Sequence, residues 1–254
     1  MIIDAHTHLF PDGMDKVGTA EMLLAEMDAC GVDRAVILGI YPRVSNAFIA
    51  EQARIHPERF IHFVSVNPND GQAAVDLFKQ CWQAFHPKGL KIHPSMQHFE
   101  ADDIALLAPL MRAVEAVSIP VLLHSWAWFG QDGEAAPRRI MTLARTFPDV
   151  TFIMAHCGGM GFLDLLPLAR LRKRGELDNL YVDLSVIIDD LADSPMWPML
   201  EWVLKTMGLD RVLMGSDFPD YSVKDTLGLV RTLELDEHDM ALVSGHNAQQ
   251  LFGV

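Results

Sequence analysis

Short apolar runs alternate along the chain with longer segments in which apolar residues recur at helical spacing. Eight short runs predict β-strands: 2–8, 34–40, 60–67, 89–93, 120–124, 151–156, 180–184 and 212–216. The longer segments predict helices: 20–30, from Asp70 to about 85, 104–117, 137–146, 196–207 and from Ser222 onward. Strands that alternate with helices imply parallel strands joined by crossovers.

Helix-ending residues support this pattern. Thr19 can cap the helix over 20–30, and Gly31 can end it, while Pro137 suits a first helical turn. Eight strand–helix units in 254 residues predict a single-domain (β/α)8 TIM barrel over 1–254. A doubly wound open sheet is the alternative, but its first turn should carry a glycine-rich phosphate loop. The segment 9–13, Leu-Phe-Pro-Asp-Gly, is no such loop.

Composition narrows the function classes. The formal net charge of −14 argues against nucleic acid as a partner, because phosphates need a basic face. No apolar run approaches the roughly 20 residues of a membrane span. Cys30, Cys81 and Cys157 are widely spaced, so they predict neither a disulfide framework nor a thiolate zinc site. With no secretion signal at the start, the expected location is the cytoplasm.

Potential metal ligands stand at the ends of the predicted strands. His6 and His8 point the same way, because side chains alternate along a strand. Strand-end ligands recur later in the chain: His93, His124, His156 and Asp217. Reactive groups of α/β barrels gather at the carboxyl ends of the strands, so these residues are expected to converge. A cation offsets the cost of burying them, and nitrogen and oxygen ligands suit zinc best, with manganese or iron as alternatives.

These segments resemble the amidohydrolase superfamily, and more closely its amidohydrolase-2 branch of aminocarboxymuconate semialdehyde decarboxylase-like enzymes. The resemblance rests on Asp4-Ala-His6-Thr-His8, Gly89-Leu-Lys91-Ile-His93-Pro94, His124, His156-Cys-Gly-Gly159, Gly215-Ser-Asp217-Phe-Pro219 and Asn247-Ala-Gln-Gln-Leu-Phe252. It covers the whole chain and implies a barrel with one or two divalent metals. It also implies hydrolysis or a lyase reaction such as decarboxylation.

The resemblance also implies roles for individual residues. The implied metal ligands are His6, His8, His124 and Asp217, and Asp217 also handles a proton. His156 acts on water or substrate in single-metal members and is a ligand in two-metal members. Lys91 matches the position of a carboxylated bridging lysine. An unmodified Lys91 would instead bind a substrate carboxylate, which favours a single ion.

Other residues are candidates for the substrate pocket. Lys91 and His93 turn inward together, and Trp126, with Trp128 and Phe129, could wall a small planar substrate. Arg43, Arg138 and Arg139 are candidate carboxylate anchors. For at least one of Arg138 and Arg139, a solvated position is favoured. We interpret the remaining histidines as structural or solvated: His56, His62, His86, His98, His238 and His246.

The ligand set allows more than one reaction. The main hypothesis is a metal-dependent hydrolase that activates water to cleave an amide, ester or lactone in a small molecule, with or without a carboxylate. The alternative is a metal-dependent lyase, a non-oxidative decarboxylase or hydratase, at the same site. A non-catalytic metal-binding barrel is the third hypothesis. The expected partner is a small-molecule substrate, and association into a homo-oligomer stays open.

Overall fold

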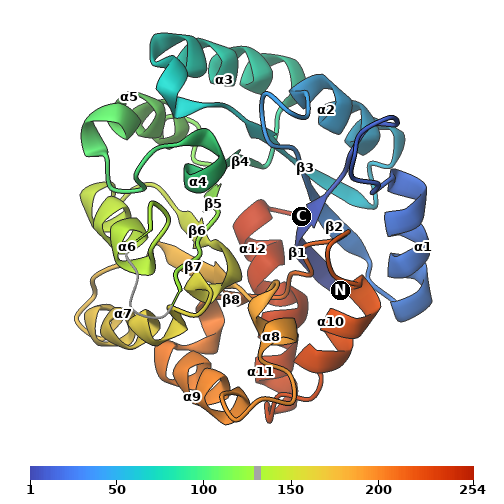
Figure 1. The fold of residues 1–254 in the computed structure, drawn as a ribbon, viewed down its shortest axis with the longest axis vertical. Helices are drawn as coiled ribbons and strands as arrows, with labels where there is room; N and C mark the ends of the chain where they lie inside the picture. Colours follow the sequence, from blue (N-terminus) through green and yellow to red (C-terminus); the bar gives the residue numbers. More distant parts are fainter. Residues whose placement is uncertain (129–132) are drawn as a thin grey trace.

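A computed structural model of the chain describes residues 1–128 and 133–254. Eight strands follow one another around a barrel, and each pairs in parallel with the next (Figure 1). Their bounds are β1 (Ile3–His8), β2 (Arg34–Leu38), β3 (Phe60–Ser65), β4 (Gly89–Ile92), β5 (Val121–Leu123), β6 (Phe152–Met154), β7 (Leu180–Asp183) and β8 (Val212–Leu213). The predicted (β/α)8 barrel is confirmed.

Backbone hydrogen bonds join β1 to the segment that follows β8. The amide of Ala5 donates to the carbonyl of Met214 at 2.8 Å, and the amide of Asp217 donates to the carbonyl of His6 at 2.8 Å. Further along, the amide of His8 donates to the carbonyl of Phe218 at 2.7 Å. These bonds bring Asp217 beside the two histidines of β1.

Helices surround the barrel (Figure 1). They are α1 (Ala20–Cys30), α2 (Asn46–Ile55), α3 (Gln72–Phe85), α4 (Pro94–Gln97), α5 (Ile104–Glu115), α6 (Pro137–Thr146), α7 (Leu165–Arg172), α8 (Ile187–Asp190), α9 (Trp197–Met207), α10 (Val223–Val230), α11 (Glu237–Ala241) and α12 (Asn247–Phe252). The predicted bounds of α1 and α6 are confirmed, and Thr19 and Gly31 cap α1 as expected. The sequence patterns did not predict α2 or α7.

Two predicted strands end early. The predicted strand 151–156 stops at Met154, and the predicted strand 212–216 stops at Leu213. The φ angle of His156, 57°, is in the left-handed region, which is incompatible with a strand ladder, and Asp217, just after the second predicted strand, has a φ of 65°. The chain therefore leaves the sheet just where the candidate site residues stand.

A small apolar cluster fills the barrel interior. It includes Ile61 and Phe63 of β3 together with Phe252 of α12. The rings of Phe63 and Phe252 meet edge to face, 5.5 Å apart, so α12 covers one end of the interior. Gly89 is required beside them, because a Cβ at this position would lie 2.3 Å from the Phe63 ring.

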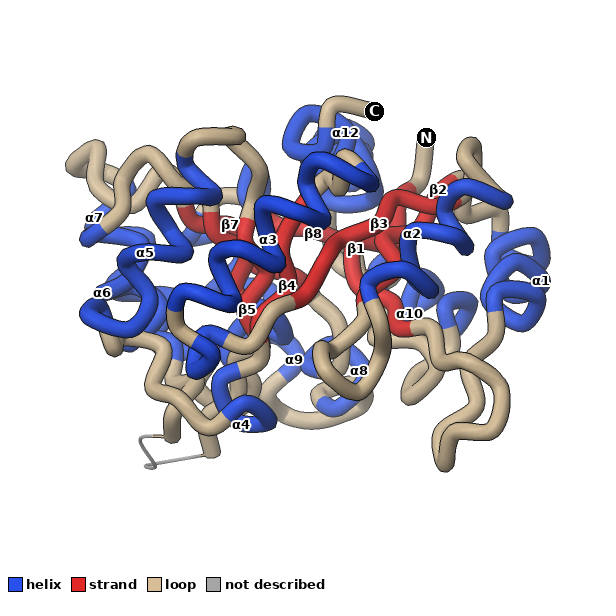
Figure 2. The backbone as a smooth tube through the Cα atoms, turned by 90° about the horizontal axis from the view of Figure 1, so that it is seen from above, coloured by secondary structure: helices blue, strands red, loops and turns tan. Residues whose placement is uncertain are grey.

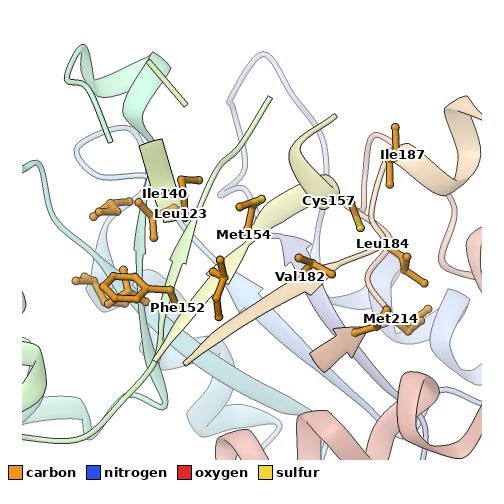
Figure 3. Packing of buried hydrophobic residues seen from close by; sticks show 14 of the residues in the cluster. Leu123, Ile140, Phe152, Met154, Cys157, Val182, Leu184, Ile187 and Met214 are labelled. Carbon is orange, nitrogen blue, oxygen red and sulfur yellow. The ribbon is translucent and has the colours of Figure 1, made fainter. Parts of the chain in front are cut away.

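The larger core lies between the barrel and the helices. Figure 3 shows part of it, where Leu123, Phe152, Met154 and Val182 of neighbouring strands pack with Ile140 of α6. Figure 2 places α12 and both termini at one end of the barrel and long loops at the other. In the described part of the chain, no helix is long and apolar enough to cross a membrane.

Candidate active site and metal centre

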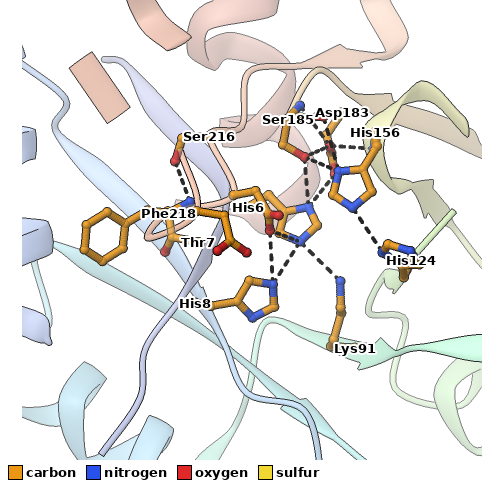
Figure 4. Close-up of polar contacts among 12 residues, drawn as sticks. His6, Thr7, His8, Lys91, His124, His156, Asp183, Ser185, Ser216 and Phe218 are labelled. Atoms are coloured by element: carbon orange, nitrogen blue, oxygen red, sulfur yellow. Dashed lines mark hydrogen bonds and ion pairs between the residues drawn. The ribbon is translucent and has the colours of Figure 1, made fainter. Parts of the chain in front are cut away.

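Polar side chains from both ends of the sequence meet at the carboxyl ends of the strands (Figure 4). The group is almost fully buried and contains three imidazoles, an amine, a hydroxyl and two carboxylates: His6, His8, Lys91, His156, Asp183, Ser185 and Asp217. The predicted convergence of strand-end residues is therefore found in the structure.

His6, His8 and Asp217 form a compact triangle of potential ligand atoms. His6 Nε2 and His8 Nε2 are 3.3 Å apart, and Asp217 Oδ1 lies 3.4 Å from the first and 3.3 Å from the second. Burial lowers the pKa of both histidines, so each is neutral near pH 7 and keeps one nitrogen lone pair. Three potential ligand atoms thus lie around a common point.

Asp183, at the end of β7, fixes the proton position on His6. Its Oδ2 lies 2.9 Å from His6 Nδ1, so the imidazole donates from Nδ1 and leaves Nε2 as the lone pair. Burial would raise the pKa of Asp183, but the charge and hydrogen bond of His6 outweigh it and lower the pKa to about 2. Asp183 is therefore an anion that can only accept hydrogen bonds.

A second chain of hydrogen bonds runs from Asp183 to His124. The Ser185 hydroxyl donates to Asp183 Oδ1 and lies 2.8 Å from His156 Nδ1. His156 Nδ1–H must then donate to that hydroxyl, which leaves Nε2 as an acceptor. His124 Nδ1 lies 3.1 Å from this Nε2 and donates to it, so the lone pair of His124 is on Nε2. One carboxylate thereby sets the tautomers of His6, His156 and His124.

An unusual backbone segment carries His156. Four consecutive residues, His156 to Gly159, have positive φ angles of 57°, 50°, 85° and 64°. Glycine is required in the second half of the segment, because a Cβ on Gly159 would lie 2.6 Å from the Trp126 indole. The tight turn directs His156 back into the barrel, where its ring stacks on His6 with centroids 5.0 Å apart.

Lys91 is the buried cation of the site. Its exposed fraction is 1%, and its Nζ lies 3.2 Å from His6 Nε2. Burial lowers the pKa of Lys91 to about 8, and the charges of Asp217 and Asp183 limit the decrease. Lys91 is thus still mostly an ammonium at neutral pH, beside the triangle of potential ligand atoms.

A pocket of about 200 Å³ opens above this group. Lys91, His93, His124, His156 and Asp217 are among the residues that line it. The ring of His93 stacks on His124 at 3.8 Å. His93 Nδ1 accepts the amide of Met96 at 3.2 Å, so the remaining proton of His93 is on Nε2. His93 is therefore a neutral hydrogen-bond donor in the pocket wall.

The outer part of the pocket carries two cations that are already paired. Arg43 binds Asp15, and Lys16 binds Asp220. Both cations lie over the ring of Phe10, at 5.9 Å and 5.4 Å from its centroid. Arg43 thus lies on the pocket wall, and its role as a carboxylate anchor stays a prediction.

Other predicted substrate residues lie elsewhere. Trp126 packs against Trp128 and His156 and is not among the residues that line the pocket. Arg139 is held in ion pairs with Asp102 and Glu100. Arg138 lies 4.0 Å from Asp164, and Phe129 falls outside the described residues.

The sequence patterns missed three residues of the site. Asp183 and Ser185 stand at the end of β7, the same kind of position that singled out the histidines, but no role was assigned to them. Asp4 is fully buried, and its Oδ1 accepts the amides of His6 and Ser216 at 3.1 and 3.0 Å. Burial raises the pKa of Asp4 to about 7.

The donor set fits a divalent ion. His6, His156 and Asp217 offer ligand atoms that all lie within 4.8 Å of one another, and His8 lies against two of them. Neutral imidazoles and a carboxylate are ligands for zinc, manganese or iron, and the hydrogen bond of His6 to Asp183 is typical support for a metal-bound histidine. Such a group at the carboxyl ends of barrel strands defines a metal-dependent barrel enzyme.

The chain belongs to the amidohydrolase family, whose family model matches residues 3–254. It is 22% identical over 254 residues to gamma-resorcylate decarboxylase from Polaromonas sp. strain JS666. The matched region covers 83% of this chain and 75% of that protein. The resemblance found in the sequence motifs is confirmed.

Solved structures share the fold. An uncharacterized TIM-barrel protein from Bordetella bronchiseptica has a TM-score of 0.80 and 21% identity, covering 99% of this chain and 98% of the other. The 5-carboxyvanillate decarboxylase from Novosphingobium aromaticivorans has a TM-score of 0.75 and 17% identity, and the match covers 100% of this chain and 96% of the other. That enzyme was crystallised with manganese and 4-hydroxy-3-methoxy-5-nitrobenzoic acid. Of the two reactions that the sequence left open, the lyase fits these relatives better, and the hydrolase matches only the broad superfamily.

Proposed function

We propose that this chain is a metal-dependent decarboxylase that removes carbon dioxide, without an oxidant, from a small hydroxylated aromatic carboxylate. The observation that carries the proposal is the buried Lys91 ammonium in a pocket of about 200 Å³, directly beside the His6–His8–Asp217 triangle. The pocket is smaller than the range typical for drug-sized ligands, so it suits a single ring. The reactions named for the relatives support the substrate class.

The proposal includes one divalent ion held by His6, His8, His124 and Asp217. The tautomers deduced above support this set, because they leave a lone pair on Nε2 of His6 and of His124. The nitrogen and oxygen donors favour zinc, whereas the carboxyvanillate decarboxylase carries manganese. When bound, the ion would act as a Lewis acid toward substrate oxygens. Metal analysis of the purified protein distinguishes the two ions.

In the proposed reaction, Lys91 and the Nε2–H of His93 bind the substrate carboxylate. Asp217 is the base: burial would raise its pKa, but the hydrogen bond from His8 and the charges of His6 and His8 hold the pKa well below its usual range. Its Oδ2 takes the phenolic proton. His156 keeps His124 oriented by accepting its Nδ1 proton.

Asp217 then returns that proton to the ring carbon that bears the carboxylate, as the phenolate electrons move into the ring. The bond from this carbon to the carboxylate breaks, and its electron pair restores the aromatic ring. Carbon dioxide and a phenolate leave, and solvent protonates the phenolate. One proton and one carboxylate are consumed for each carbon dioxide released, so the step is balanced.

The test compares a carboxylate with a lactone. Purified metal-loaded protein is incubated with 2,6-dihydroxybenzoate and, separately, with dihydrocoumarin. We expect carbon dioxide and resorcinol in equal amounts from the first, and no lactone opening above that of the Asp217→Asn variant. Lactone opening without carbon dioxide from any hydroxybenzoate would contradict the proposal and favour the hydrolase.

A further inference from the structure

A second cavity, of about 550 Å³, lies between α2 and α3 on the outside of β3. Its lining includes Arg34, the first residue of β2, Phe60, the first residue of β3, and Lys88, which directly precedes β4. The cavity is thus at the amino ends of the strands, whereas the candidate active site is at their carboxyl ends. Figure 1 shows α2 and α3 as neighbours in the outer ring.

His62 of β3 places a polar side chain in the layer between the barrel and the helices, which is mainly apolar. Along β3, Ile61 and Phe63 face the barrel interior, while Phe60 and Val64 belong to the outer core. Alternation places His62 on that outer side as well. Facing it, α2 offers alanines, including Ala50 and Ala53. The small side chains leave room in the layer that large apolar residues fill elsewhere.

Two buried nitrogen atoms in this cavity have no hydrogen-bond partner among the described residues: His62 Nε2 and Arg34 Nε. Burial lowers the pKa of His62 to about 4, so the ring is neutral. Its one N–H bonds to the backbone of Phe85, which leaves Nε2 as an acceptor. The cavity therefore offers an unused acceptor and an unused donor, each of which is costly when left unpaired.

The cavity also carries uncompensated positive charge in an acidic chain. Glu51 and Arg54, at the rim, bind each other through two hydrogen bonds of 2.7 Å. Within residues 1–128 and 133–254, neither Arg34 nor Lys88 has an acidic group within ion-pair distance. Lys88 Nζ makes one long contact of 3.4 Å to the carbonyl of Gly253.

We propose that the α2–α3 cavity binds a small hydroxylated aromatic carboxylate at a site separate from the active site. The carboxylate binds Arg34 and Lys88, the ring packs on Ala50 and Phe85, and the hydroxyl donates to His62 Nε2. Arg34 Nη2 donates to the carbonyl of Pro57 at 2.9 Å, but neither Arg34 nor Lys88 has a carboxylate partner among the described residues, so an anion complements both. A hydroxyl is the neutral group that satisfies a neutral imidazole acceptor. The site does not depend on the proposed decarboxylase reaction.

The binding experiment uses 4-hydroxybenzoate, benzoate and phenol in isothermal titration calorimetry. All proteins carry Lys91→Met, which weakens binding at the active site. We expect saturable binding of 4-hydroxybenzoate, with a loss on the order of tenfold for benzoate and for phenol, the energy of about one hydrogen bond or ion pair. Arg34→Gln should weaken carboxylate binding, and Ala50→Leu should abolish it by filling the cavity.

His62→Leu makes the test specific for the hydroxyl. In this variant benzoate and 4-hydroxybenzoate should bind equally, because the acceptor is gone. Arg145→Gln, which removes an exposed arginine paired with Glu176, is the matched control and should change nothing. The comparison of the three ligands on the parent protein remains valid if a variant fails to fold. The proposal would be overturned if the folded parent showed no saturable binding of 4-hydroxybenzoate. It would also be overturned if Arg34→Gln, His62→Leu and Ala50→Leu all bound this ligand as tightly as the parent does.

Discussion

Asp183 Oδ2 accepts a hydrogen bond from His6 Nδ1 at 2.9 Å, which ties the end of β7 to β1, with only β8 between the two strands. The other oxygen of the same carboxylate accepts the Ser185 hydroxyl and, at 2.9 Å, the amide of His156. Asp183 contacts the candidate ligands His6 and His156 without joining the triangle of potential ligand atoms. It therefore positions the site rather than forming part of its reactive face.

Asp183→Asn should lower metal affinity while the barrel stays folded. An amide NH₂ facing His6 would favour the tautomer with the proton on Nε2, which removes the lone pair that a metal needs. Loss of such a supporting partner typically costs about 10–100-fold in affinity. Chelator competition measures the affinity, and circular dichroism monitors the fold. Asp178→Asn, at an exposed residue just before β7, is the control, and equal affinity in both variants would refute the positioning role.

Lys91→Met should raise the KM for the carboxylate substrate while metal content per chain is unchanged. The ammonium is the buried cation closest to the proposed carboxylate position, and a thioether cannot replace its charge. Metal analysis and steady-state kinetics on the same preparation test this. Lys205→Met, at a surface lysine paired with Glu201, should behave as wild type. A lower metal count in Lys91→Met would instead indicate a carboxylated lysine that bridges two ions, with His156 as a ligand.

Asp217→Asn should leave the barrel folded and abolish turnover. The amide can neither accept the phenolic proton nor supply negative charge to a cation. Circular dichroism checks folding, and carbon dioxide release measures turnover. Asp220→Asn, also in the pocket lining but paired with Lys16, should retain most activity. Activity near that of wild type in Asp217→Asn would remove this residue from the proton-transfer role.

The sequence predicted those parts of the site that depend on local pattern. Two-residue alternation put His6 and His8 on one face of a strand, and their Nε2 atoms are 3.3 Å apart in the structure. The rule that barrel sites gather at strand ends brought in Lys91, His156 and Asp217. These inferences need only the periodicity of a strand and the order of the elements.

The sequence could not predict features that depend on contacts between distant segments. Asp183 is 177 positions from His6, and nothing in its own neighbourhood reveals that partner. The positive φ angles of His156 and Asp217 could not be read from the residue types, because histidine and aspartate adopt that conformation only in a minority of positions. The cavity beside His62 likewise arises only when α2 and α3 pack on β3.

Gly159→Ala should destabilise the protein and reduce activity more than Gly175→Ala. Both glycines have positive φ, 64° and 75°, so both substitutions are strained, and Gly159 also has a ψ of −139°, a combination that is close to glycine-only. A Cβ on Gly159 would also lie 2.6 Å from the Trp126 ring, whereas nothing lies within 4 Å at Gly175. Displacing Trp126 disturbs the contact that supports His156. Denaturant unfolding and turnover assays measure both effects, and equal losses in the two variants would show that the Trp126 contact is unimportant.

The stability of the wild-type protein should fall more steeply than that of His62→Leu as the pH decreases from 6.5 to 4. The pKa of His62 is lowered from 6.5 to about 4 in the folded chain by burial, so over this interval the unfolded state binds a proton that the folded state does not. By linkage this destabilises the folded state as the pH falls, by an amount on the order of 3 kcal/mol for one such group. Leucine does not titrate, so the variant should lack this contribution. Urea unfolding of both proteins at several pH values isolates it, because the other histidines are common to the two. Parallel pH profiles would mean that His62 is protonated in the fold as readily as in the unfolded chain.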